Sequence, residues 1–163
     1  MLTSIEDGKY FASRYFNHDS IFFIGRNLDY AMGLEGSLKL KEISYIHSEA
    51  YASGELKHGT ISLIEPGTLV VALGTYEPLF DKAMSNVVEV KARGAEVLAL
   101  ATEPFAEKMA HTADSVIAVP ETPPVVQPSL GVVHLQLFAY YVALRRGSDI
   151  VKPRNLANSM TVA

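Results

Sequence analysis

The chain has 163 residues, of which 48% are hydrophobic, and 14 Lys and Arg against 18 Asp and Glu give a formal net charge of −4. A chain of this length can bury a full hydrophobic core as one domain. The absence of cysteine excludes thiol catalysis, a disulfide framework and cysteine-ligated metals. The acidic balance, without a stripe of basic residues, argues against nucleic acid as a partner and leaves anionic metabolites open.

The sequence carries no targeting or membrane signal. Its first 16 residues alternate charged and apolar side chains, whereas a signal peptide has an apolar core before a cleavage site of small residues. No apolar run approaches the roughly 20 residues that cross a bilayer. We therefore expect a soluble, cytoplasmic protein that does not associate with membranes.

Apolar segments closed by glycine or polar residues predict buried strands that alternate with helices. The predicted strands are Ser20–Ile24, Thr68–Leu73, Glu96–Ala101 and Ser115–Val119. The predicted helices span residues 4–17, Leu28 to about His47, Pro78–Arg93 and Ser129–Arg145. The segment between the second helix and the second strand, residues 51–66, is rich in glycine and short polar residues and reads as an ordered loop.

This alternation predicts an α/β fold, a three-layer α/β/α sandwich of the flavodoxin-like or Rossmann-like kind with a parallel sheet of about five strands. We expect an N-terminal helix in residues 1–19, the domain itself in residues 20–147, and a polar tail in residues 148–163. Gly33 and Gly36 lie three residues apart in a helix, a spacing that lets another backbone pack closely. No dinucleotide, P-loop or metal motif occurs, so no metal site or cofactor is predicted.

Two groups of ionisable residues are candidates for chemistry. Spacings of four and three place Glu35, Lys39 and Glu42 on one stripe of a helix, with the cation between two carboxylates. The stripe is either a solvated helix face or, if it borders a cleft, a base at Glu42 beside a charge-stabilising Lys39. His58 lies in a glycine-bounded loop, where it is either an exposed loop histidine or a residue that transfers protons. His134 lies in an apolar stretch and is predicted to be a core residue.

Several motifs in order resemble the second sugar-isomerase (SIS) half of the glutamine–fructose-6-phosphate aminotransferase family, the glucosamine-6-phosphate synthases. They are LEGSLKLKE at residues 34–42, ISYIHSEAYASGELKHG up to residue 59, HLQLFAYYVALRRGSDIVKPRNLA at residues 134–157, and the closing SMTV. The resemblance covers nearly the whole chain from about residue 20. It implies the SIS type of fold and amination with isomerisation of fructose 6-phosphate to glucosamine 6-phosphate.

The resemblance also implies roles for residues of this sequence. Glu42 would move the proton between C1 and C2 of the sugar, Lys39 would assist charge on the neighbouring oxygens, and Glu35 would support both. His58 would open the sugar ring in the active site of a neighbouring subunit. A proton is most easily removed next to a carbonyl or imine by a carboxylate beside a positive charge, so these roles agree with the residue types.

The C-terminal tail would wrap over the sugar and bring Ala157 and Asn158 to the substrate. At position 158 the family carries a lysine, thought to hold the keto sugar as a Schiff base, and an asparagine amide cannot form that imine. The chain also lacks the Ser/Thr-rich loop with which the family's first half cradles phosphate. Its corresponding loop, residues 74–77, reads GTYE and carries a carboxylate. We therefore expect weak binding of fructose 6-phosphate.

Three hypotheses remain for the function of the chain. It is the catalytic isomerase half, a non-catalytic phosphosugar-binding or regulatory module, or a dimerisation and scaffold piece. The expected partners are the phosphosugars fructose 6-phosphate and glucosamine 6-phosphate, a second copy in a homodimer, and the first SIS half and glutaminase domain of a larger protein. Product formation would separate the first hypothesis from the others, and stabilisation by ligand would separate the second from the third.

Overall fold

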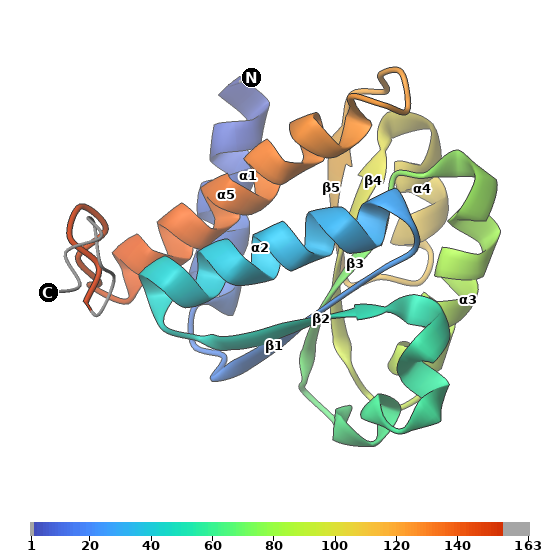
Figure 1. Cartoon of the computed structure of the whole chain (residues 1–163), viewed down its shortest axis with the longest axis horizontal. Helices are drawn as coiled ribbons and strands as arrows, with labels where there is room; N and C mark the ends of the chain where they lie inside the picture. Colours follow the sequence, from blue (N-terminus) through green and yellow to red (C-terminus); the bar gives the residue numbers. More distant parts are fainter. Residues whose placement is uncertain (1, 155–163) are drawn as a thin grey trace, which may run out of the picture.

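The structure is a computed structural model that describes residues 2–154, with side chains from residue 5 onward. Five strands form one parallel sheet in the order β2-β1-β3-β4-β5, and helices cover both of its faces (Figure 1). The strands are β1 Ser20–Gly25, β2 His47–Ala52, β3 Leu69–Gly74, β4 Glu96–Thr102 and β5 Ser115–Val119. The predicted three-layer fold with a five-stranded parallel sheet is confirmed.

The helices alternate with the strands along the chain. They are α1 Leu2–Tyr15, α2 Leu28–Ser44, α3 Phe80–Lys91, α4 Glu103–Ala110 and α5 Gln127–Arg145. Three short 3-10 segments complete the connections: η1 Ser53–His58, η2 Thr60–Leu63 and η3 Glu77–Leu79. Helices α1, α2 and α5 pack on one face of the sheet, and α3, α4 and η1 pack on the other.

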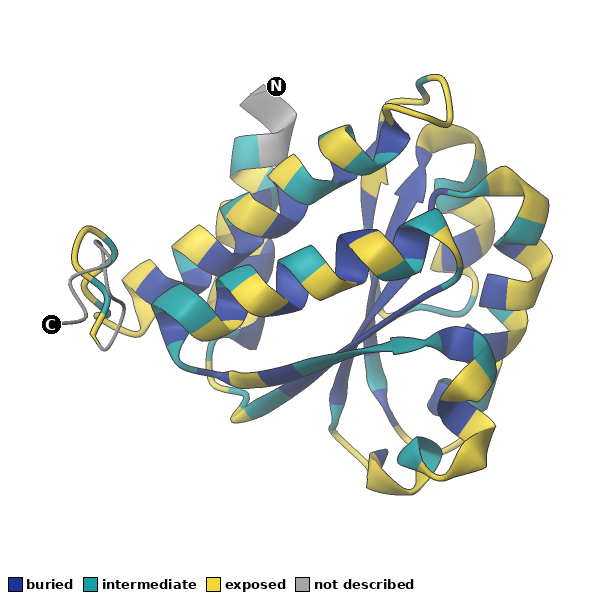
Figure 2. Cartoon of the chain, viewed as in Figure 1, coloured by how far each residue is buried: buried dark blue, intermediate teal, exposed yellow. Residues whose placement is uncertain are grey.

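The core consists of two apolar layers separated by the sheet, whose strands β1, β3 and β4 are almost wholly buried (Figure 2). Successive residues of a strand point to opposite faces, so Ile21 and Phe23 join the layer under α1, α2 and α5, while Phe22 and Ile24 join the other. Because both faces are covered, the strands read as continuous apolar runs rather than alternating ones. This explains why the sequence pattern locates four of the five strands.

Close packing of α2 against its neighbours depends on small residues, as predicted. A Cβ atom added at Gly36 would lie 2.6 Å from Leu135 Cδ1 of α5 and 3.1 Å from the Phe23 ring. His134 of α5 is buried, as predicted, and its Nδ1 lies 3.0 Å from the carbonyl oxygen of Leu130. Glycine at position 36 therefore lets α2 approach α5 and the sheet at the same place.

Three elements differ from the prediction. Helix α2 ends at Ser44 rather than near His47, with Tyr45 in the left-handed region at φ 61°, and strand β2 follows at once. Strand β2 forms the edge of the sheet, where one side is half-exposed, so its polar residues mask the strand pattern. Helix α4 has only eight residues, too few for the sequence pattern to predict it.

Candidate functional site

The carboxylate–lysine–carboxylate stripe forms on α2 as the spacing predicts. Lys39 Nζ lies 2.8 Å from Glu42 Oε2 and 3.7 Å from Glu35 Oε1. The hydrogen bond to Glu42, with a smaller contribution from Glu35, raises the pKa of Lys39 above its usual value. The three side chains are between 27% and 35% exposed, so each can contact a molecule that docks against this face.

The stripe borders an open, largely apolar surface rather than a closed cleft. Lys39 lines a hollow of about 350 Å³ between α2 and α5, together with Ile43, Val133, Gln136 and Tyr140. Large hydrophobic side chains are exposed beside it on the same two helices: Leu34, Leu38, Val133, Tyr140 and Leu144. We call these five residues the α2–α5 apolar face. Within residues 2–154, the three side chains of the stripe stay partly open to solvent.

His58 is not brought together with the stripe. It ends η1, after the carboxyl end of β2, whereas Glu42 lies two residues before the end of α2, near the amino end of β2 (Figure 1). The six residues of β2 separate these two places by about 20 Å. The His58 side chain is 75% exposed, and its Nε2 lies 3.9 Å from Glu55 Oε2.

The segment that carries His58 is nevertheless held to the body of the domain. Leu56 of η1 is fully buried, and Lys57 Nζ lies 2.6 Å from Glu89 Oε1 of α3. The hydrogen bond from Lys57 lowers the pKa of Glu89 below its usual value. The segment predicted as an ordered loop therefore consists of the end of β2, the anchored helix η1 and the short helix η2.

The loop after β3 corresponds in position to the phosphate-binding loop of the family's first half. The buried Asp29 carboxylate, in the first turn of α2, accepts hydrogen bonds from the Thr75 N–H at 3.0 Å, the Tyr76 N–H at 3.2 Å and the Thr75 hydroxyl. Burial raises the pKa of Asp29. An internal carboxylate thus occupies the backbone donors that would otherwise be free to bind an anion.

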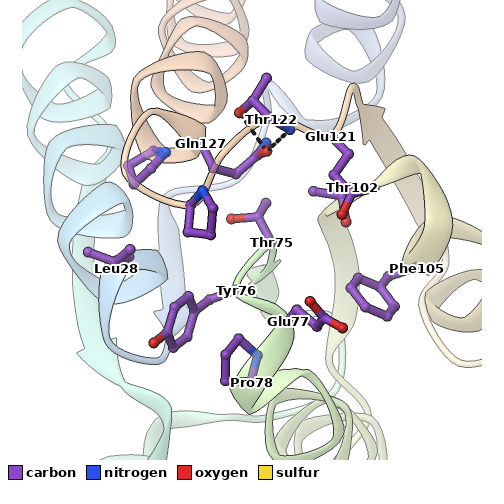
Figure 3. A pocket seen from close by; sticks show the side chains of 12 residues that line it. Leu28, Thr75, Tyr76, Glu77, Pro78, Thr102, Phe105, Glu121, Thr122 and Gln127 are labelled. Carbon is purple, nitrogen blue, oxygen red and sulfur yellow. Dashed lines mark hydrogen bonds between the residues drawn. The ribbon is translucent and has the colours of Figure 1, made fainter.

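A pocket of about 180 Å³ lies beyond that loop, at the carboxyl ends of β3, β4 and β5 (Figure 3). One wall, Leu28 at the start of α2, comes from the side of β1; β1 and β3 are neighbours whose following helices cross to opposite faces, the usual ligand crevice of such sheets. Its lining residues are Leu28, Thr75, Tyr76, Glu77, Pro78, Thr102, Phe105, Glu121, Thr122, Pro124, Gln127 and Pro128. Of these the sequence pattern singles out only the GTYE loop, because the others come from connections distant in the chain.

The last described residues turn back over α2. The Arg154 N–H donates to the Tyr45 hydroxyl at 2.8 Å, and the Arg154 guanidinium lies 4.1 Å from the centre of the Tyr45 ring. The predicted substrate residues Ala157 and Asn158 lie outside the described residues. Within residues 2–154, no helix is long and apolar enough to span a membrane.

The fold and the stripe on α2 define a doubly wound α/β domain with a lysine held between two carboxylates. Residues 14–146 match the family model described as the SIS domain, and the chain belongs to that family. It is 55% identical over 162 residues to the glutamine–fructose-6-phosphate aminotransferase (isomerizing) of Clostridium acetobutylicum, covering 99% of this chain and 26% of that protein. The corresponding protein of Caldanaerobacter subterraneus is 56% identical over 152 residues, or 93% of this chain and 25% of its own length.

Solved structures agree with these relatives. The C-terminal domain of glucosamine-fructose-6-phosphate aminotransferase from Francisella tularensis superposes with a TM-score of 0.85 at 35% identity, over 91% of this chain and 42% of that one. A glucosamine-6-phosphate deaminase from Thermotoga maritima superposes with a TM-score of 0.70 at 26% identity, over 94% of this chain and 44% of that one. The chain spans about a quarter of the length of the curated relatives it matches.

Proposed function

We propose that the chain is the second sugar-isomerase half of a glucosamine-6-phosphate synthase, and that it contributes to converting fructose 6-phosphate into glucosamine 6-phosphate. The observation that carries the proposal is Lys39 held between Glu35 and Glu42, in a chain 55% identical to an aminotransferase of that activity. Glu42 acts as the base that moves the proton between C1 and C2 of the sugar. Lys39, kept protonated by its neighbours, stabilises negative charge that develops on the substrate oxygen.

The phosphate of the substrate is bound outside this chain in our proposal. Asp29 already occupies the backbone donors of the loop after β3, so that loop has no open cradle for an anion. A first SIS half supplies the phosphate loop and covers the α2–α5 apolar face, placing the sugar against the stripe. A glutaminase domain elsewhere in the larger protein supplies ammonia, because this chain contains no cysteine to do so.

His58 serves a second subunit in this proposal. Within one chain, Glu42 lies near the amino end of β2 and His58 beyond its carboxyl end, and a strand of six residues is about 20 Å long, so the two are placed too far apart to contact one sugar ring. A homodimer that brings His58 of one chain to the stripe of another removes this obstacle. His58 then opens the sugar ring by transferring a proton, while the C-terminal tail with Ala157 and Asn158 closes over the sugar.

The test of the catalytic role uses this chain combined with a first SIS half of the same family. Glu42→Gln keeps the shape and removes the carboxylate, so exchange of the C1–C2 proton with solvent should stop while stability hardly changes. Glu107→Gln on α4 is the matched control, because Glu107 is exposed and distant from the stripe in the sequence. Normal exchange in Glu42→Gln would show that Glu42 is not the base.

A second candidate function is binding of a phosphosugar without turnover. Asn158 favours it, because an amide cannot form the imine that the family's lysine at this position is thought to form. Asn158→Lys in the same combined module should then yield an adduct with fructose 6-phosphate that borohydride traps as a mass increment. Turnover with Asn158 unchanged would reject the binding-only function, and sugar binding without any product would support it.

A further inference from the structure

The pocket at the carboxyl ends of β3, β4 and β5 is lined by two exposed carboxylates that form no ion pair among the described side chains. Glu77 comes from η3 and Glu121 from the connection between β5 and α5, and both line the pocket (Figure 3). Among the described side chains, neither forms an ion pair with a lysine, arginine or histidine. Two exposed carboxylates from separate connections therefore line one small cavity.

A buried hydroxyl in the same pocket lacks a partner. Thr102, at the end of β4, is 2% exposed, and its Oγ1 is the one buried side-chain polar atom without a hydrogen bond in the described part of the chain. Its neighbours have partners: Gln127 accepts from the Thr122 N–H at 2.7 Å and hydroxyl at 2.8 Å and donates to the Pro120 carbonyl at 3.2 Å. A buried hydroxyl left alone costs stability, so Thr102 is available to a ligand.

The remaining walls disfavour an anion and offer an apolar surface. Asp29 already accepts from the Thr75 and Tyr76 N–H groups, so these two backbone donors are not open to an anion. Phe105 stacks on Phe80 with ring centres 4.2 Å apart, and the Lys108 ammonium lies 5.6 Å from the Phe105 ring centre. The Lys108 ammonium thus already lies over this aromatic pair in the geometry of a cation–π interaction, so Phe105 offers the pocket an apolar wall.

We propose that this pocket binds a small organic cation, a primary ammonium group on a compact and partly apolar body. The ammonium group lies between the Glu77 and Glu121 carboxylates and donates to Thr102 Oγ1, and the body rests on Phe105 and Pro78. A volume of about 180 Å³ is below the roughly 300–1,000 Å³ of sites for drug-sized ligands, which excludes a nucleotide. The site does not depend on the stripe of α2 or on the catalytic proposal.

The experiment titrates the 163-residue chain with n-butylamine and n-butanol, which match in size and differ in charge, and follows backbone amides by NMR. The amine should cause saturable shifts at Thr75, Tyr76 and Thr102, with butanol binding at least about tenfold more weakly. Added salt should weaken the amine and leave butanol unaffected, because only the amine carries charge.

Variants test each group in turn. Glu77→Gln and Glu121→Gln should each weaken amine binding roughly threefold to fivefold, as expected for exposed ion pairs. Glu107→Gln, an exposed carboxylate on α4 that does not line the pocket, should change nothing. Thr102→Val should weaken binding while keeping or raising stability, because it replaces an unpartnered buried hydroxyl with a methyl group.

Three results would overturn the proposal, provided that the amide spectrum of the core strands shows an unchanged fold. The first is equal affinity for butylamine and butanol. The second is full amine affinity after both glutamates are replaced. The third is the absence of any saturable shift at the pocket amides.

Discussion

Asp29 connects the first turn of α2 to the loop after β3, and its removal should be costly. The carboxylate is 2% exposed and accepts hydrogen bonds from three groups, two of them on Thr75, which is itself buried. Asp29→Ala leaves these donors without an acceptor. At about 1–3 kcal/mol for each buried donor on Thr75, with a smaller cost for the half-buried Tyr76 N–H, we expect a loss of about 3–5 kcal/mol.

Asp29→Asn is the matched comparison because it keeps the shape. The single amide oxygen of the asparagine can accept from the Thr75 and Tyr76 N–H groups. The NH2 group can donate to the Thr75 hydroxyl, which then acts as an acceptor instead of a donor. The asparagine variant loses the extra strength that a charged acceptor gives to hydrogen bonds. In return, the neutral amide does not carry the cost of burying a charge, which is what raises the pKa of Asp29. We expect Asp29→Asn to cost less than about 2 kcal/mol, well below the alanine variant.

The assay is urea unfolding of the three proteins at neutral and acid pH. The pKa of Asp29 in the folded state lies above its ordinary value of 3.8, so between these two values the native state holds more protons than the unfolded state. The stability of the unmodified chain relative to Asp29→Asn should therefore fall as pH rises through that window. An alanine variant that loses less than about 1 kcal/mol, or an asparagine variant as unstable as alanine, would refute the reasoning.

Two further predictions concern packing and the anchor of η1. Gly36→Ala should destabilise the domain by about 1 kcal/mol in thermal or urea unfolding, because the clash with Leu135 and Phe23 exceeds the helix propensity that alanine adds, and a stabilised variant would contradict this. Glu89→Gln should cost less than about 1 kcal/mol at pH 7, since Lys57 is 64% exposed. The pKa of Glu89 is lowered from 4.5 in the folded state, so the stability difference between the unmodified chain and Glu89→Gln is present above pH 4.5 and should vanish as pH falls through the pKa of the folded state. A stability difference that stays constant down to pH 2 would argue against the ion pair.

Local patterns in the sequence by themselves determine a large part of this protein. Continuous apolar runs predict four of the five strands, because a parallel sheet covered on both faces buries most residues of its inner strands. The spacing of Glu35, Lys39 and Glu42 predicts one helix stripe, because contacts three and four residues apart depend only on helix geometry. The resemblance to the aminotransferase family rests on the same contiguous motifs.

Features that depend on strand pairing or on contacts between distant residues are visible only in the tertiary structure. Strand β2 became a strand by pairing with β1, and its edge position allowed a polar sequence that no periodicity revealed. The hydrogen bonds of Asp29 join residues 46 and 47 positions apart. The pocket gathers Glu77 from η3, Thr102 from the end of β4 and Glu121 from the connection between β5 and α5. Periodicity in the sequence reports only on neighbours along one helix or strand. The crossover connections make the strands parallel and bring their carboxyl ends to one edge of the sheet, and this arrangement is visible only in the tertiary structure.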